Sequence, residues 1–254
     1  KIGRVYFFDL IGGGIGALLI VPLLYLLDAP TIVILTALTM AFSSFLFSLN
    51  CQKKLKIISG IITFLMLCLV FLNANYQLIR ISYVKGEKET NLLYQKWSPL
   101  GRVAVLPLEG NTIHAGALSQ NYKPKKQPQQ LRIIIDGTAE TSLDKVSNNL
   151  EKDLENLKYD ITSLAHYIAP KSRSLVIGFG GGRDILTSLL FGFEKIEGVE
   201  INPVMKEIIC QRFKNYSGKI CQMENIKLTV GEGRSYITQS SLKYSLIQLS
   251  LIDS

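Results

Sequence analysis

Apolar residues dominate the first third of the chain. Three apolar segments cover roughly 5–27, 31–49 and 57–72, and the last continues as far as Ile79. Segments of this length can cross the hydrocarbon core of a bilayer as helices. A turn at Asp28 and the basic loop Cys51–Lys56 separate them. We therefore predict about three transmembrane helices within residues 1–79, with the lipid bilayer as a partner, and we expect further helices before Lys1.

Beyond residue 80 the pattern changes to that of an α/β protein. Strand-like runs at 102–108 and 131–135 predict a small β-rich subdomain over 80–140, and helical periodicity follows over 143–169. Strand-like and helical patterns then alternate over 141–254, which predicts a Rossmann-like, doubly wound parallel sheet. Its strand-like runs are 175–177, 196–201, 226–230 and 244–251. Further strands are expected after Ser254.

The first of these strands leads into a glycine-rich turn and then a helical pattern. The next strand carries Glu200 about twenty residues further on, the spacing at which an acid accepts hydrogen bonds from ribose hydroxyls. The glycines let a ligand approach the backbone, and the helix N-terminus offers N–H groups. The motif predicts nucleoside-cofactor binding; the alternative is a tight α/β turn with a surface glutamate. The turn glycines are Gly178, Gly180, Gly181 and Gly182.

A second glycine-rich stretch, Gly12–Gly16, lies inside the first apolar segment and has no acid at the ribose distance. Gly12 and Gly16 instead predict a small-residue face for close helix packing. This stretch therefore indicates membrane packing and not a nucleotide site.

Charge and composition argue against several kinds of partner and site. The net charge of +8 is spread along the chain, and the basic cluster at 123–126 lacks interleaved aromatic residues, so we predict a solvated loop there and no nucleic-acid partner. The four cysteines form no CxxC pair, which argues against a metal site and against a disulfide framework. His114 and His166 lie far apart and are interpreted as surface or structural residues.

Two signals disagree about membrane orientation. The basic loop Cys51–Lys56 favours the cytoplasmic side, and a third crossing would then place residues 80–254 outside. Arg80, Lys85 and Lys88 follow the third segment closely, however, and nucleoside cofactors are made in the cytoplasm. We predict a cytoplasmic α/β domain.

Several segments together resemble the spermidine synthase (aminopropyltransferase) family, in particular its membrane-fused, bacterial-type branch. They are Tyr94-Gln95, 133–137, 176–184, 198–202, 231–235 and 244–253. The resemblance implies a class I methyltransferase-like fold after a small β-rich subdomain. It also implies S-adenosylmethionine or its decarboxylated form as the bound nucleoside, without a metal, and a small-molecule amine as the other substrate; a homo-oligomer is compatible with it.

Residue roles follow from the same resemblance. Gln95 would contact the cofactor tail, Glu200 the ribose hydroxyls and Glu232 the adenine amino group. The turn glycines would approach the nucleoside, and we count Asp184, just after them, with this site.

The chain departs from the family at the end of the fourth strand. The family typically reads Asp-Ser-Ser-Asp there, and the first Asp helps deprotonate the amine. The matching run is Ser250–Asp253, so the first Asp is replaced by Ser250, and we predict Asp253 as the catalytic carboxylate. A protonated amine has no lone pair for attack, and serine is a poor base without a partner. Glu140 also replaces a glutamine of the family.

These departures leave three functions open. The first is a membrane-anchored aminopropyltransferase-like enzyme that acts on an amine. The others are a methyltransferase that uses S-adenosylmethionine, and a non-catalytic membrane transport or sensor protein with a nucleoside-binding domain.

Overall fold

The computed structural model describes residues 2–108, 113, 117–123, 127–147 and 149–250. Asp253 and His114 therefore lie outside the described residues. The chain divides into two compact units, one formed by 1–88 with 96–102 and the other by 89–95 with 103–254.

The first unit contains three long apolar helices, as predicted. They are α1 (Ile2–Leu26), α2 (Ala29–Ser48) and α3 (Lys53–Tyr76), and each is long and apolar enough to cross a membrane. Helix α2 begins where the Asp28 carboxylate accepts a hydrogen bond from the Thr31 N–H at 2.9 Å, with Pro30 in the first turn. These findings support membrane insertion of the N-terminal part of the chain.

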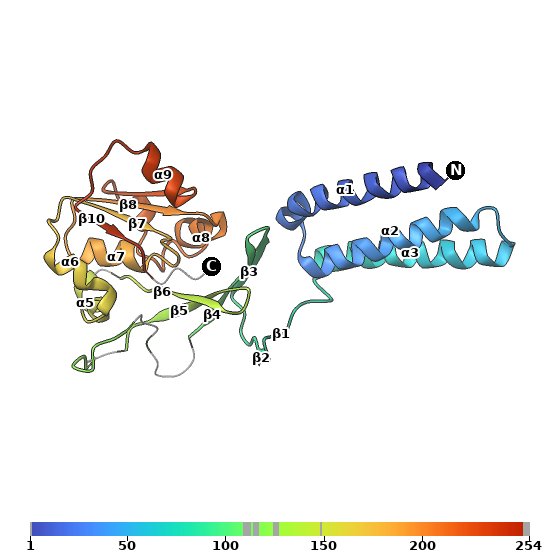
Figure 1. The fold of residues 1–254 in the computed structure, drawn as a ribbon. Coiled ribbons are helices and arrows are strands. Elements are labelled where there is room, and N and C mark those ends of the chain that lie inside the picture. The colour runs from blue at the N-terminus through green and yellow to red at the C-terminus, as the bar shows by residue number, and fades with distance from the viewer. Residues whose placement is uncertain (1, 109–112, 114–116, 124–126, 148, 251–254) are drawn as a thin grey trace. The chain divides into compact units, whose positions relative to one another are not determined.

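Helices α2 and α3 lie side by side (Figure 1). Gly60 of α3 lets the Phe45 ring approach, since a Cβ there would lie 3.4 Å from the ring. Polar contacts join the helices as well: the Ser48 and Ser59 hydroxyls are 2.7 Å apart, and Asn73 Nδ2 donates to Thr31 Oγ1 at 2.8 Å. The predicted small-residue face on α1 has no such neighbour among the described residues: a Cβ at Gly12 or Gly16 would meet nothing within 4 Å.

An antiparallel sheet precedes the Rossmann-like part, in agreement with the β-rich pattern. Its order is β3 (Tyr94–Ser98), β4 (Gly101–Pro107), β5 (Gln130–Ile135) and β6 (Ala139–Asp144), and a short hairpin of β1 (Tyr83–Val84) and β2 (Glu87–Lys88) comes before it in the chain. Asp136 and Gly137, with φ of 47° and 73°, form the turn between β5 and β6. Strand β6 was not predicted; Leu143 pairs with Leu131 of β5, so its apolar side chain belongs to a strand and not to a helix.

A parallel sheet of β7 (Arg173–Ile177), β8 (Lys195–Glu200), β9 (Ile226–Val230) and β10 (Leu246–Gln248) forms the rest of the second unit. Its order, β9-β8-β7-β10, is that of the first four strands of a doubly wound Rossmann fold. Helices α7 (Arg183–Leu190) and α9 (Gly233–Gln239) lie on opposite faces of the sheet, and α8 (Pro203–Glu207) follows β8 (Figure 1). The predicted fold class is confirmed.

The predicted helical region 143–169 is broken into short pieces. They are α4 (Leu150–Asp153), α5 (Glu155–Lys158), the 3₁₀ turn η1 (Ile161–Ser163) and α6 (Leu164–Ile168). Local side-chain caps interrupt it, because Asn149 accepts from the Lys152 N–H and Asp160 accepts from the Thr162 N–H. The apolar spacing over 143–169 therefore does not indicate one continuous helix.

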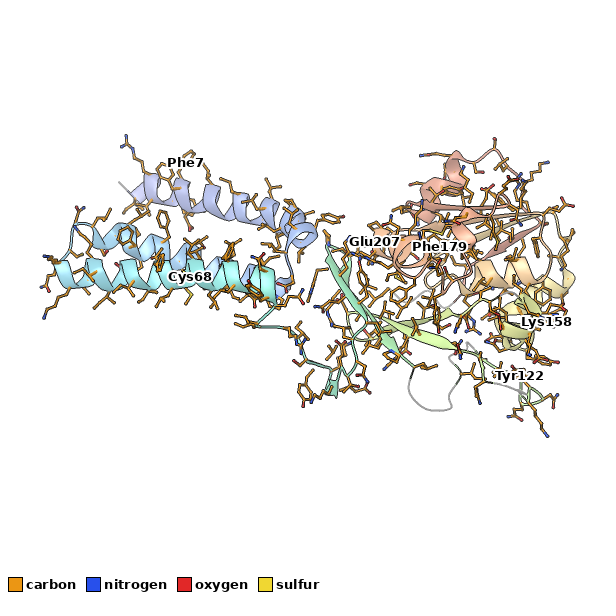
Figure 2. The ribbon with its side chains drawn as sticks, turned by 180° about the vertical axis from the view of Figure 1, so that it is seen from behind. Phe7, Cys68, Tyr122, Lys158, Phe179 and Glu207 are labelled. Carbon is orange, nitrogen blue, oxygen red and sulfur yellow. A yellow bond between two sulfur atoms is a disulfide. The ribbon has the colours of Figure 1, made fainter. Side chains whose placement is uncertain are left out.

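Two cysteines form a disulfide, which corrects the expectation from the sequence. Cys210, in the π-helical segment η2 (Ile208–Arg212), is bonded to Cys221 in the 3₁₀ turn η3 (Ile220–Gln222), with 5.5 Å between their Cα atoms. The sequence analysis relied on CxxC spacing and so did not predict this pair. The two cysteines meet because an intervening turn, with Gly218 at φ 70°, folds the chain back. Cys51 and Cys68 are free, and Figure 2 shows Cys68 on α3.

His166 is a structural residue, as predicted. It is fully buried, its Nε2 lies 3.0 Å from Ser188 Oγ, and its ring packs against Phe191 and Phe193. Burial, and then the charge of Lys171, lowers the pKa of His166 to about 4.

Candidate functional site

The glycine turn follows β7 directly and has the backbone that its sequence suggests. Gly178, Gly180 and Gly182 have φ of 70°, 48° and 88°, a region that residues with a Cβ rarely adopt. The Gly178 N–H donates to the Val199 carbonyl at 2.8 Å, which joins the turn to β8. Phe179 is buried in the α/β core (Figure 2). The turn is therefore held in a defined shape.

The remaining turn glycine, Gly181, is required by strand β6 of the antiparallel sheet. A Cβ on Gly181 would lie 1.9 Å from the Ser142 carbonyl oxygen of β6, and one on Gly180 would lie 3.4 Å from Thr141 Oγ1. The backbone of β6 thus lies directly against the turn. Close packing against β6 therefore accounts for the glycine at position 181.

Glu200 ends β8 beside the same turn. The residue as a whole is 9% exposed. Its Oε2 accepts a hydrogen bond from the Gly180 N–H at 3.1 Å, and its Oε1 accepts one from the Asn202 N–H at 3.0 Å. A carboxylate oxygen can accept two hydrogen bonds. Each oxygen of Glu200 therefore keeps acceptor capacity for a hydroxyl group, although both already hold backbone N–H groups.

Glu232 follows the neighbouring strand β9 and caps α9. Its exposed carboxylate accepts from the Arg234 N–H at 2.8 Å and the Ser235 N–H at 2.7 Å. These backbone hydrogen bonds, with that of the Ser235 hydroxyl, lower the pKa of Glu232 below its ordinary value. The Gly231 N–H donates to the Glu200 carbonyl at 2.9 Å, so Glu200 at the end of β8 lies beside the turn that leads from β9 to Glu232.

Asp184 lies in the first turn of α7 and is 8% exposed. Burial raises the pKa of its carboxyl, against the opposing effects of a hydrogen bond from Ser250 and the charge of Arg183. The neighbouring Arg183 guanidinium forms an ion pair with Asp160, also buried. The sequence motif includes Asp184 but does not reveal the ion pair beside it, because Asp160 is distant along the chain.

Gln95 lies on β3, next to Tyr94. The Tyr94 hydroxyl donates to Glu207 Oε1 at 2.7 Å, and the Arg212 guanidinium lies 5.3 Å from its ring centre. Burial, followed by the Glu207 contact, raises the pKa of Tyr94 to about 12. Because successive side chains of a strand face opposite sides, Tyr94 and not Gln95 faces the segment after Glu200.

The structure thus brings the glycine turn, Asp184, Glu200 and Glu232 to the carboxyl edge of the parallel sheet. Doubly wound folds bind ligands at this edge. Within the described part of the chain, no three histidine, cysteine or acidic side chains gather as a metal site would require.

Comparisons with known proteins give fold-level likeness alone. No protein-family model matches the sequence, and no curated protein matches it. A crystal structure of spermidine synthase in complex with the transition state analogue AdoDATO is similar at 13% identity and a TM-score of 0.43, over 70% of this chain and 57% of that one. Spermidine synthase from Thermotoga maritima is similar at 12% identity and a TM-score of 0.42, over 68% of this chain and 57% of that one. This chain thus covers less than two thirds of either.

Proposed function

We propose that the α/β domain binds an S-adenosyl nucleoside at the carboxyl edge of its parallel sheet. The observation that carries the proposal is the Glu200 carboxylate, which reaches across to the Gly180 N–H and keeps acceptor capacity on both oxygens. In this proposal the glycine turn approaches the nucleoside and Glu200 accepts from the ribose hydroxyls. Gln95 would contact the cofactor tail, and Glu232 would contact the adenine amino group. Asp184, just after the glycine turn, belongs to the same site.

We further propose that the bound nucleoside is decarboxylated S-adenosylmethionine and that the domain transfers its aminopropyl group to a small amine. The amine nitrogen attacks the carbon next to the sulfonium sulfur, the carbon–sulfur bond breaks, and the sulfur keeps the electron pair as a thioether. The attacking nitrogen needs a lone pair, so a proton acceptor must stand near it. The motifs shared with aminopropyltransferases support this reaction, and Asp253, predicted as the acceptor, lies outside the described residues.

A non-catalytic nucleoside sensor is the second candidate. The observation that favours it is Ser250 at the position where the resembling family carries its base. A sensor would bind the nucleoside and turn over no amine, so binding and product formation separate the two functions.

Calorimetry on the full chain in detergent tests the binding proposal. We expect S-adenosylmethionine, its decarboxylated form or methylthioadenosine to bind, and Glu200→Gln to weaken that binding, because the amide offers one acceptor oxygen in place of two. Glu151→Gln is the matched control, since Glu151 forms an exposed ion pair with Lys158. If none of the three nucleosides binds the folded protein, the proposed function is wrong.

We place the α/β domain on the cytoplasmic side, where S-adenosyl nucleosides are made. The basic loop between α2 and α3 counts against this orientation, as does the Cys210–Cys221 disulfide, because disulfides are typical of oxidising compartments. A cytoplasmic domain puts Cys51, at the other end of α3, on the outer side. A membrane-impermeant maleimide should then label Cys51 in intact cells, with Cys51→Ser as the control. Labelling that appears only after permeabilisation would place the domain outside.

A further inference from the structure

Helices α2 and α3, which lie side by side in Figure 1, enclose an apolar groove. Its volume is about 530 Å³, within the roughly 300–1,000 Å³ that is typical of small-molecule sites. Phe42, Phe64 and Leu67 line the groove and are each at least half exposed, so no described part of the chain covers it. The rest of the wall comes from the same two helices, chiefly from Leu38, Phe45 and Gly60. In a membrane-inserted chain this groove is open to lipid.

The wall of the groove is apolar throughout. Two threonines contribute to it, and both of their hydroxyls are used within their own helices. Thr39 Oγ1 donates to the Thr36 carbonyl at 2.7 Å, and Thr63 Oγ1 donates to the Ser59 carbonyl at 2.8 Å. A polar group placed inside the groove would lose its hydrogen bonds, which is costly. The part of a ligand that enters the groove is therefore a hydrocarbon.

One face of α3 continues from this groove to the start of the helix. Its residues follow one another at alternating intervals of three and four positions, the spacing of a single helical face: Lys53, Lys56, Gly60, Thr63 and Leu67. Lys54 lies about 100° from Lys53 around the helix and belongs to another face. The distance along the axis from Lys56 to Leu67 is about 16 Å at 1.5 Å per residue. This is close to half of the roughly 30 Å hydrocarbon core, so the groove and its lysines extend through one leaflet.

The charge at this end of the groove is positive and unpaired in the described part of the chain. The sequence holds no aspartate or glutamate between Asp28 and Glu87, and the three lysines of the loop, Lys53, Lys54 and Lys56, form no ion pair with any described acid. The residue before the helix, Gln52, makes no side-chain hydrogen bond to the first turn of α3. The lysines and the N-terminal N–H groups of the helix both favour an anion.

We propose that the groove binds an anionic phospholipid, with one acyl chain between α2 and α3 and the phosphate at Lys53 and Lys56. A phospholipid carries a hydrocarbon chain and an anion in the order in which the groove and the lysines receive them. A second copy of the chain fits less well, because a copy in the same membrane orientation brings its own lysines to the same depth, where like charges repel. The site belongs to the helical unit and does not depend on the proposed nucleoside function.

Native mass spectrometry of the full chain in detergent tests the headgroup contact. The probes are dioleoyl phosphatidylglycerol, which is anionic, and dioleoyl phosphatidylcholine, which has no net charge; we expect the anionic lipid to bind more tightly. Lys53→Gln should weaken phosphatidylglycerol binding about fivefold, the effect of one basic residue near an anionic surface, and should leave phosphatidylcholine binding unchanged. Lys54→Gln is the matched control, because it removes the same charge one residue away on another face.

A second pair of variants tests the groove itself. Leu67→Trp should place a larger ring in the groove and lower the affinity for both lipids severalfold. Leu65→Trp is the matched control, because Leu65 lies on the same helix with nearly the same exposure, 55% against 54% for Leu67, but does not line the groove. Thr39→Phe fills the groove from α2 and should act like Leu67→Trp, so the test does not depend on one substitution.

Three results would overturn this proposal. Equal losses in Lys53→Gln and Lys54→Gln would mean that the loop attracts anions without a defined site. Equal lipid affinities in Leu67→Trp and Leu65→Trp would mean that the groove holds no acyl chain. A changed oligomeric state in Leu67→Trp with unchanged lipid binding would make the groove an interface between copies. Circular dichroism shows that each variant remains helical, and nucleoside binding, measured on the same variants, should stay unchanged whether or not the lipid site exists.

Discussion

Replacing Gly181 by alanine tests whether the glycine turn is shaped by strand β6. The added methyl carbon would lie 1.9 Å from the Ser142 carbonyl oxygen and 2.7 Å from its carbonyl carbon. Both are backbone atoms of a paired strand, so no side-chain rotation can relieve the clash. Either β6 or the turn must move.

Overpacking of this kind costs typically 1–3 kcal/mol, and a backbone clash this short belongs at the upper end, about 3 kcal/mol or more. A loss of that size lowers Tm by roughly 6–12 °C in a domain of this length. The measurement is thermal unfolding of the full chain in detergent, followed by circular dichroism without nucleoside. Because no ligand is present, a drop in Tm reports packing alone.

Gly231→Ala is the matched control, at the end of the neighbouring strand β9. Its Cβ would meet Val199 Cγ2 at 3.7 Å, an ordinary contact, and the N–H that donates to Glu200 is kept. We expect this variant to melt close to the wild type. If Gly181→Ala melts no lower than Gly231→Ala, then β6 does not constrain the turn, and the glycine must be explained by a ligand.

Two further predictions concern stability. The Cys210–Cys221 bond closes a short loop, so its reduction should lower the free energy of unfolding by about 2–3 kcal/mol. The urea midpoint should fall when reductant is added, and the double serine variant should show the same lower midpoint without reductant. Equal midpoints with and without reductant would contradict this prediction. The pKa of His166 is lowered from 6.5 to about 4 on folding, so its contribution to stability is complete above pH 6.5 and is lost as pH falls towards 4. The loss amounts to about 3 kcal/mol. Urea titrations at stepped pH should show stability falling between pH 6.5 and 4 in the wild type but not in His166→Gln. An equal fall in the variant would assign this pH dependence to other groups.

The sequence alone determined those features that depend on neighbours along the chain. The three apolar helices follow from continuous apolar runs, and the parallel sheet follows from alternating strand and helix patterns. The positions of Gly178 and Glu200 followed from their spacing, because a strand, a turn and a helix of ordinary length leave little freedom in where the next strand ends. The helical periodicity of 143–169 was misleading, because local caps broke one expected helix into several.

Only the tertiary structure decided which distant residues meet. The contact of Gly181 with Ser142, the Cys210–Cys221 bond and the ion pair between Arg183 and Asp160 each join segments separated along the chain. Local propensity carries no information about such pairs. They arise when two sheets and their helices pack into one core, and that packing determines which buried polar groups must find partners. For this reason the sequence predicted the edge of the sheet where the candidate site lies, whereas the partners of its acids became visible only in the folded chain.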